Sequence, residues 1–278
     1  MSAVNPIEDS VSRLVAFIVE REAVRQRRAA GQAWPWTEDP ILAEYRFCNV
    51  RREDDAVTMW IAQYWRSNNV DGWHDMVVAR LFNNVETLQE LRPGMLLRSM
   101  RTIVRARQKR GGRVFNPAYM ITTAGKKQDK IDYIFELLDT LWKARERLRP
   151  QPGNTLNSYH MLLGQFQGLG SFLTAQVVAD LKYVEPLRSA GDWHTFAASG
   201  PGSRRGMNYI LGRDPKSPWQ EDDWRQKLNK LQVATAVHLK RHKIELHAQD
   251  LQNCLCEYSK WNRARLTGQM PKQRYGHG

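Results

Sequence analysis

The sequence predicts an all-α fold, because apolar residues recur at helical spacing along most of the chain. The clearest apolar stripe runs from Ile131 to Trp142, with members at i, i+3, i+4 and i+7. A short strand-like segment, 117–123, interrupts this pattern. Further helices are predicted at residues 7–28, 55–65, 224–243 and 251–261.

The charge balance of the 278-residue chain indicates a polyanionic partner. Its 42 Lys and Arg residues outnumber 29 Asp and Glu residues, which gives a formal net charge of +13. Such an excess favours nucleic acid before an anionic membrane, although a role in solubility alone is the simpler alternative. The sequence shows neither a long apolar run nor a secretion signal, so we expect no membrane span and a cytoplasmic protein.

The cysteines and glycine motifs predict no cofactor. Cys48, Cys254 and Cys256 are an odd, small set that is typical of free thiols in a reducing compartment. The lone CxC pair lacks a second pair, so we expect no zinc or iron–sulfur site. No Walker loop and no Rossmann glycine pattern occurs, which predicts no organic cofactor. A metal ion at a bound phosphate stays open.

The chain has one good candidate for a domain break, the Pro- and Gly-containing stretch 147–158. It separates a helical lobe, residues 1–150, that carries basic segments from a second lobe, residues 151–278. We expect the two lobes to interleave, because motifs far apart in the chain must meet in one cleft.

Two short amphipathic helices are predicted at 158–166 and 171–181, joined by a Gly-x-Gly turn. Glycine allows positive φ, and the first turn of a helix exposes N–H groups at the positive end of its dipole. A phosphate oxygen fits such a site whatever the base sequence. An ordinary corner between helices is the alternative, but the net charge favours DNA contact. The DNA-binding candidates are Gly168, Leu169, Gly170 and Ser171.

This hairpin resembles that of the helix-hairpin-helix DNA glycosylase superfamily, which implies a two-lobed, glycosylase-like helical fold. In that fold a catalytic Asp follows the second hairpin helix and opens the next one, and Asp192 stands at about that distance. Strand-cleaving members carry a Lys where this chain has Phe172, which argues against Schiff-base chemistry.

Further stretches, 39–61, 115–134, 191–212 and 256–275, carry specific motifs such as YRFCNVRREDD and GPGSRRG. Together they resemble the phage α-glutamyl/putrescinyl-thymine pyrophosphorylases, also described as amino acid:DNA transferases. The resemblance implies thymine hypermodification, in which an amine displaces pyrophosphate from a pyrophosphorylated hydroxymethyl-uracil in DNA. The implied partners are modified phage DNA and an amino acid or polyamine donor, in the host cytoplasm.

That reaction needs fixed cations and backbone donors where the pyrophosphate departs. Arginine forks match phosphate oxygens in pairs, and the glycines of GPGSRRG suggest an anion nest. A solvated loop, or contact with the DNA backbone, is the alternative for each cluster. The candidates are Arg46, Asn49, Arg51, Arg52, Lys126, Ser203, Arg204 and Arg205.

The incoming amine must lose a proton, which a carboxylate could accept. Asp192 is the first candidate, because the resemblance places it beside the flipped nucleotide. It could equally cap a helix. Asp54 and Asp55 are the second candidates, with a structural ion pair or a helix cap as the alternative.

The basic segment 98–113 predicts a track for the DNA backbone that includes Arg101 and Arg105, with a solvated helix as the alternative. Two other functions fit the same residues. A DNA glycosylase would leave abasic sites and would use Asp192. A non-catalytic DNA-binding module would keep its function after Asp192→Asn.

Overall fold

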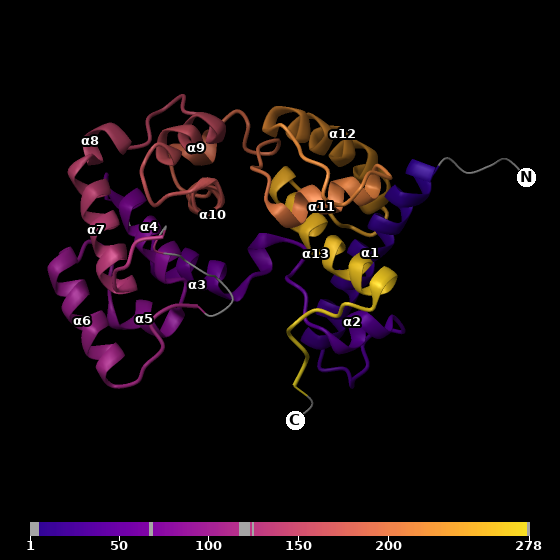
Figure 1. Ribbon diagram of the computed structural model, residues 1–278, viewed down its shortest axis with the longest axis horizontal. Coiled ribbons are helices and arrows are strands. Elements are labelled where there is room, and N and C mark those ends of the chain that lie inside the picture. The colour runs from indigo at the N-terminus through magenta and orange to yellow at the C-terminus, as the bar shows by residue number, and fades with distance from the viewer. Residues whose placement is uncertain (1–5, 67–68, 117–122, 124, 277–278) are drawn as a thin grey trace, which may run out of the picture. The chain divides into compact units, whose positions relative to one another are not determined.

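The computed structural model describes residues 6–66, 69–116, 123 and 125–276 (Figure 1). In these ranges the regular structure is helical and no strand occurs, so the predicted all-α class is confirmed. An isolated antiparallel bridge joins Tyr45 to Arg274. Residues 117–122 of the strand-like segment lie outside the described residues.

The helices follow the apolar spacing of the sequence closely. Their bounds are α1 (Pro6–Ala29), α2 (Pro40–Glu44), α3 (Ala56–Tyr64), α4 (Gly72–Phe82), α5 (Val85–Glu90), α6 (Leu97–Lys109), α7 (Lys130–Lys143), α8 (Arg145–Leu148), α9 (Leu156–Gly164), α10 (Ser171–Leu181), α11 (Pro201–Ile210), α12 (Glu221–Lys240) and α13 (Ala248–Thr267). Two 3-10 turns, η1 (Arg52–Asp54) and η2 (Leu187–Ser189), complete the set.

The chain divides into two compact units. Unit 1 consists of Met1–Asp55 and His194–Gly278, and unit 2 of Ala56–Trp193. The predicted boundary at residue 150 therefore falls inside unit 2, and residues 1–150 do not form one lobe. The physical reason is that α1 packs against α11, α12 and α13, so the first helix completes a core built by the end of the chain.

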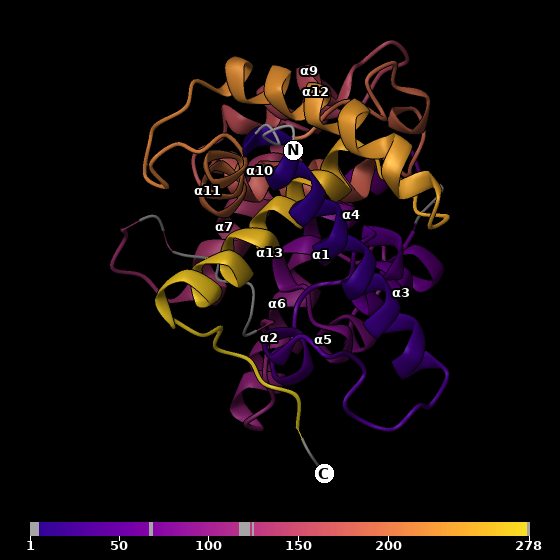
Figure 2. The same cartoon turned by 90° about the vertical axis from the view of Figure 1, so that its right-hand side faces the viewer.

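The core of unit 1 forms where these four helices meet, as Figures 1 and 2 both show. Leu14 and Ile18 of α1 are fully buried there, with Trp224 of α12 and Leu255 of α13. Burying each such side chain stabilises the unit by about 1.5–3 kcal/mol. The apolar stripe of α1 thus packs against α11, α12 and α13, which lie much later in the chain.

The segment GPGSRRG forms the start of α11, not the glycine-rich loop that an anion nest requires. A Cβ at Gly206 would overlap the main-chain carbonyl of Leu255, and one at Gly202 would overlap the Cys256 sulfur. The two glycines therefore permit a close crossing of α11 and α13. Their role in packing explains this part of the motif.

Unit 2 is built around α4, which packs against α7 and α10. Every residue of α4 is buried, including Arg80, whose guanidinium forms a two-pronged ion pair with Asp180 of α10 at 2.5 and 2.7 Å. The helix lacks a continuous polar face, so apolar periodicity alone does not predict it. The ion pair fixes α4 against the second helix of the hairpin.

The two hairpin helices α9 and α10 are in contact, and the residues 165–170 connect them. Gly168 has a φ of +102°, and a Cβ there would lie 2.7 Å from the Tyr133 hydroxyl. Both facts require glycine at this position. Gly170 precedes α10 and offers no side chain to cap it.

Candidate functional site

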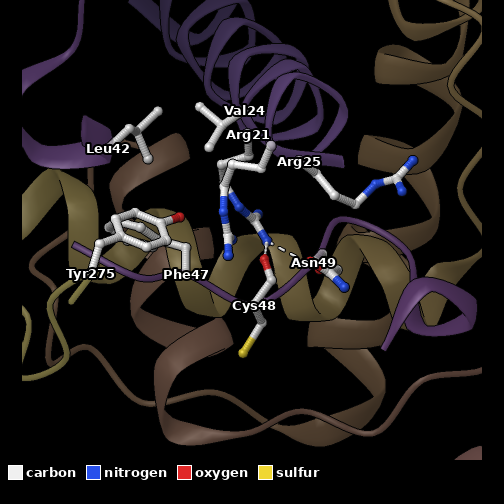
Figure 3. A pocket seen from close by; sticks show the side chains of 9 residues that line it. Arg21, Val24, Arg25, Leu42, Phe47, Cys48, Asn49 and Tyr275 are labelled. Atoms are coloured by element: carbon white, nitrogen blue, oxygen red, sulfur yellow. Dashed lines mark hydrogen bonds between the residues drawn. The ribbon is translucent and has the colours of Figure 1, made fainter. Parts of the chain in front are cut away.

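The face of α1 that follows Glu20 presents three arginines at i, i+4 and i+7. Arg21, Arg25 and Arg28 line a small hollow, with room for about one water molecule, together with Asn49 and Tyr275 (Figure 3). We call it the arginine hollow. Arg28 lies over the rings of Trp36 and Tyr275, at 5.1 and 4.8 Å.

Arg21 is the buried member of this set, with 5% of its surface exposed. Its Nη2 donates to the carbonyls of Cys48 and Asn49, the latter at 3.2 Å. Its Nε and Nη1 have no hydrogen-bond partner among the described residues. Its guanidinium carbon lies 5.0 Å from the centre of the Phe17 ring. A buried cation that is held by two main-chain carbonyls is therefore part of the wall of the hollow.

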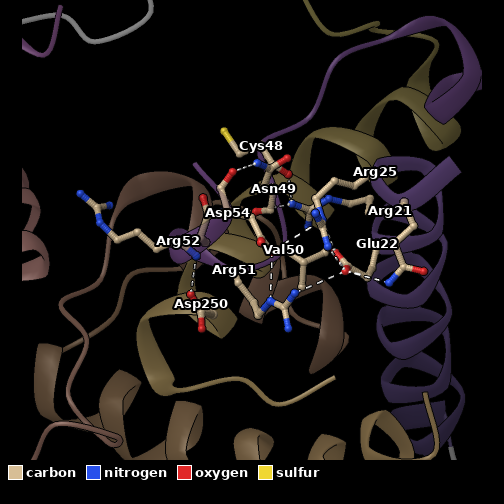
Figure 4. A network of polar contacts seen from close by, with 12 residues as sticks. Arg21, Glu22, Arg25, Cys48, Asn49, Val50, Arg51, Arg52, Asp54 and Asp250 are labelled. Carbon is tan, nitrogen blue, oxygen red and sulfur yellow. Dashed lines mark hydrogen bonds and ion pairs between the residues drawn. The ribbon is translucent and has the colours of Figure 1, made fainter. Parts of the chain in front are cut away.

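Residues 46–55, here called the arginine loop, pass between α1 and α13 (Figure 4). From the α13 side, Glu257 accepts from the backbone N–H of Cys48 at 3.2 Å, and Asp250 from that of Arg52 at 2.9 Å. Side chains of α13 thus hold the loop that α1 contacts from its other side.

Carboxylates alternate with guanidinium groups where the loop meets α1. Arg25 donates to both oxygens of Glu22, at 2.9 and 2.6 Å, and Arg51 donates to Asp54 at 3.0 Å. Longer ion pairs of 3.6 Å link Arg51 with Glu22 and Arg25 with Asp54. Burial alone would raise the pKa of Glu22, but hydrogen bonds from Arg25 and Gln26 and the charges of Arg25 and Arg51 lower it. Glu22 is therefore ionised at neutral pH, and its carboxylate orients Arg25 and Arg51.

The structure brings Asn49, Arg51 and Asp54 of the predicted set into this network. Asn49 donates to the backbone carbonyl of Asp54 at 2.5 Å. Arg46, whose backbone N–H donates to Gln273, and Asp55 both have exposed side chains. The spacing of Arg21, Arg25 and Arg28 along one helical face is the signal that could have identified the α1 arginines.

The predicted residues of GPGSRRG make their contacts elsewhere in unit 1. Ser203 is buried and accepts from the backbone N–H of Gly200, as part of the cap of α11. Arg204 donates to Ser199 at 2.6 Å and to Glu221 at 2.9 Å. Arg205 donates to Ser259 of α13 at 3.4 Å.

Asp192 lies in a turn of unit 2 and does not open a helix, in contrast to the expectation from the resemblance. One carboxylate oxygen accepts from the backbone N–H of Leu156 at 2.7 Å, and the other from that of Asn157 at 2.9 Å. Asp192 therefore caps the first helix of the hairpin, which precedes it in the chain.

The predicted DNA-binding residues are all in unit 2. At the hairpin, Gly170 and Ser171 are exposed, while the Leu169 side chain is fully buried, so only its backbone could reach a phosphate. Arg101 and Arg105 of α6 pair with Asp132 of α7 at 2.6 and 2.5 Å, and Arg105 also pairs with Asp129 at 2.7 Å. These ion pairs neutralise part of the basic track.

Lys126, in the loop before α7, is the remaining predicted anion-binding residue. Its ammonium lies 5.5 Å from the centre of the Tyr133 ring. Among the described residues, no group of three or more His, Cys, Asp and Glu side chains gathers as metal ligands. Every helix in the described ranges is too short or too polar to serve as a membrane span.

The cysteine thiols are poor nucleophiles. The Glu257 carboxylate raises the pKa of the exposed Cys48 to about 12, and burial raises that of Cys254 to about 11. Burial also raises the pKa of Cys256. Since the thiolate is the reactive form, the raised pKa values disfavour a nucleophilic role for these cysteines at neutral pH.

Comparisons with known proteins identify relatives of this chain. Residues 8–269 match the profile of a family described as "5-hmdU DNA kinase, helical domain". A curated relative, the 5-hmdU DNA kinase of Bacillus phage SP10, is 25% identical over 225 residues. The matched region covers 70% of this chain and 35% of the relative, so the chain spans about a third of that protein's length. No solved structure matches.

Proposed function

The chain belongs to the 5-hmdU DNA kinase helical-domain family, and from this premise we propose that it is a transferase of thymine hypermodification in DNA. In the proposed reaction, the amine of an amino acid or polyamine attacks the methylene carbon of a pyrophosphorylated hydroxymethyl-uracil. The bond from that carbon to the pyrophosphate oxygen breaks, a carbon–nitrogen bond replaces it, and the amine loses a proton.

Membership of this family supports a reaction that belongs to the same modification sequence as a kinase step. The name of the phage relative describes a kinase that acts on 5-hmdU in DNA. A kinase product carries a phosphate ester on the base methylene, which turns a poor leaving group into one that an amine can displace. The present sequence has no phosphate-binding loop of the G-x-x-x-x-G-K-[ST] type. The resemblance to the pyrophosphorylases supports displacement of a pyrophosphate group by an amine.

The observation that carries this proposal is the arginine hollow. Arg21, Arg25 and Arg28 line it from one face of α1, and the Arg28 side chain is exposed at its edge. Planar guanidinium groups bind phosphate oxygens in pairs, and fixed cations stabilise charge that grows on a leaving group. We propose that the departing pyrophosphate binds at the mouth of this hollow.

The predicted arginines of the arginine loop are proposed to add positive charge beside the hollow. Arg51 is held by Glu22 and Asp54 at the edge of the network, and Arg46 and Arg52 belong to the same loop. We propose that Arg204, Arg205 and Lys126 contact phosphates of the substrate, whereas the buried hydroxyl of Ser203 serves the cap of α11.

We propose Asp54 as the group that accepts the proton of the amine. Its Oδ2 is held by Arg51, which orients the carboxylate within the arginine network, and Asp55 lies next to it in the chain. A role for Asp192 as the base would require its carboxylate to leave the N–H groups of Leu156 and Asn157. Asp192 is better suited to ordering the hairpin, whose exposed turn is proposed to hold the DNA backbone.

The test supplies the protein with DNA that carries pyrophosphorylated 5-hydroxymethyl-uracil and a panel of amino acids and polyamines. Digestion and mass spectrometry should reveal an aminated thymine, and pyrophosphate should be released in equal amount. Omission of the amine or use of unmodified DNA should abolish both signals. Abasic sites in place of the new nucleoside would identify a glycosylase, and binding without either product would identify a DNA-binding module.

A further inference from the structure

Unit 1 carries an exposed aromatic side chain that the proposed chemistry does not use. Trp34, in the connection from α1 to α2, has 50% of its surface exposed. The other described aromatic side chains of unit 1 are buried or partly buried. We call Trp34, with the partly buried Trp36 and Tyr275, the aromatic platform. A single exposed ring is common on protein surfaces, so the surroundings of Trp34 decide whether it can bind a ligand.

Main-chain contacts hold the platform together. Trp34 donates from Nε1 to the carbonyl of Ala43 at 3.0 Å. The carbonyl of the next residue, Glu44, accepts from the backbone N–H of Tyr275 at 3.0 Å. The ring of Tyr275 meets that of Trp36 edge to face, with 5.1 Å between their centres. The indole of Trp34 is therefore held in place before a ligand binds, so little rotamer entropy is lost when a ligand stacks on it.

Two exposed arginines flank the platform. The guanidinium of Arg28 lies over two of its rings, 5.1 Å from the centre of Trp36 and 4.8 Å from that of Tyr275. Arg46 is tied to the same end of the chain, because its backbone N–H donates to the carbonyl of Gln273 at 2.9 Å. The side chains of Arg28 and Arg46 are exposed and form no ion pair within the described part of the chain. Both guanidinium groups are therefore available to phosphate oxygens.

A fixed, exposed ring beside such arginines is typical of proteins that bind single-stranded nucleic acid. In a duplex the neighbouring bases cover both faces of each base, so an exposed indole can stack only on an unpaired base. Aromatic and arginine side chains also occur together at protein interfaces, but the net charge of +13 favours a polyanion. Arg28 and Tyr275 also line the arginine hollow, so the platform adjoins the proposed pyrophosphate site.

We propose that unit 1 binds an unpaired stretch of DNA, with one base stacked on Trp34 and phosphates of the same strand at Arg28 and Arg46. The protein then prefers a single strand, or a locally opened duplex, to a closed duplex. This inference rests on the proposed function, because it takes DNA as the substrate, and it adds the strand state that the site accepts.

The test is fluorescence anisotropy of the full chain with labelled DNAs of equal length. They are a thymidine strand, the same strand in a duplex, and a strand of abasic units that keeps the phosphates and lacks the bases. At about 200 mM salt, phosphate contacts contribute less to binding. The thymidine strand should then bind about tenfold more tightly than the abasic strand, as expected for one stacked base. It should also bind more tightly than the duplex.

Trp34→Leu keeps an apolar side chain and removes the ring. It should weaken binding of the thymidine strand about tenfold and leave binding of the duplex and the abasic strand nearly unchanged, whereas Trp34→Phe should retain most of the affinity. The matched control is Trp142→Leu in unit 2. Trp142 is 39% exposed and has the Arg145 guanidinium 5.0 Å from its ring centre. This control should bind the thymidine strand like the wild type.

The proposal is overturned if the duplex or the abasic strand binds as tightly as the thymidine strand. It is also overturned if folded Trp34→Leu binds that strand like the wild type, or if Trp142→Leu weakens binding equally. The comparison of strands uses the wild-type protein, so it remains decisive if Trp34→Leu does not fold. Weak binding of all the DNAs would likewise overturn it and would point to a protein partner at the platform.

The failure of this inference can be told apart from that of the transferase proposal, because the binding test contains neither a pyrophosphorylated base nor an amine. A strand preference without transfer activity would remove only the transferase proposal. Transfer activity without a strand preference would remove only the present inference.

Discussion

Arginine side chains have three different roles in this protein, and the surroundings of each arginine determine its role. Arg80 is buried and fully engaged by Asp180, so it fixes two helices of unit 2. Arg21 is equally buried, yet two of its nitrogens lack partners among the described residues. Arg28 is exposed over two aromatic rings. Of these three arginines, Arg28 is the one whose donors a phosphate could engage, because its side chain is exposed.

Arg28→Gln should weaken the binding of inorganic pyrophosphate by about tenfold, which is about 1.4 kcal/mol, because it removes one guanidinium from the arginine hollow. The matched control is Arg27→Gln, which removes the same charge from α1. Arg27 pairs with Glu20 and does not line the hollow. Isothermal titration of both variants measures the difference. Equal weakening would indicate only a general electrostatic effect and would contradict the assignment.

Glu22→Gln should make the stability of unit 1 less dependent on acid. The folded-state pKa of Glu22 lies below its ordinary value of 4.5, so its ionised form contributes stability above pH 4.5. That contribution is lost as the pH falls through the folded-state pKa. Urea unfolding should show the wild type more stable than Glu22→Gln at neutral pH, with a gap that narrows below pH 4.5. A gap that stays constant with pH would show that the charge of Glu22 is not involved.

At the scale of elements, the crossing of α11 and α13 shows how packing decides the meaning of a motif. GPGSRRG reads as a flexible, glycine-rich anion site, but Gly202 and Gly206 face the backbone and sulfur of α13. The helix that results also places Arg204 against Glu221 and Arg205 against Ser259. GPGSRRG therefore serves mainly as part of a close-packed helix, and its arginines contact groups of unit 1.

Gly206→Ala should destabilise unit 1 by about 1–3 kcal/mol, because the new methyl group meets the Leu255 carbonyl, and main chain cannot move aside cheaply. Gly164→Ala is the control in α9, where a Cβ meets nothing within 4 Å. Because alanine favours a helix, that change should be neutral or stabilising by up to about 1 kcal/mol. Thermal unfolding of both variants measures the contrast. Similar stabilities would mean that α11 and α13 do not cross closely.

At the scale of the whole molecule, the net charge of +13 is not gathered on one helix. The basic helix α6 gives up much of its charge to carboxylates of unit 2, since Arg107 pairs with Glu86 and Glu90 as Arg101 and Arg105 pair with α7. Contact with DNA is therefore expected to depend on several separate groups, among them the hairpin turn and the arginine loop.

The affinity for double-stranded DNA should fall steeply with salt, because phosphate contacts release counterions. Four such contacts would weaken binding about a hundredfold between about 50 and about 200 mM salt. Fluorescence anisotropy with a labelled duplex measures the slope. An affinity that does not change with salt would exclude contacts with the DNA phosphates as the source of binding. The net positive charge would then serve only the solubility of the protein.

The sequence by itself determined the helical class and the position of most helices, because apolar periodicity depends on neighbours three and four residues apart. It also indicated the hairpin turn, where Gly168 needs a positive φ. For the candidate site it identified the arginine loop, with Asn49, Arg51 and Asp54. These features are local, so a local pattern encodes them.

Only the tertiary structure decided which groups meet. It joined α1 to the end of the chain, added Arg21 and Arg25 to the loop, and placed the carboxylate of Asp192 on the N-terminus of a helix that precedes it. The bond between Cys48 and Glu257 links residues 209 positions apart. No spacing in the sequence specifies such a contact, because it arises from the way whole helices bury their apolar faces against one another.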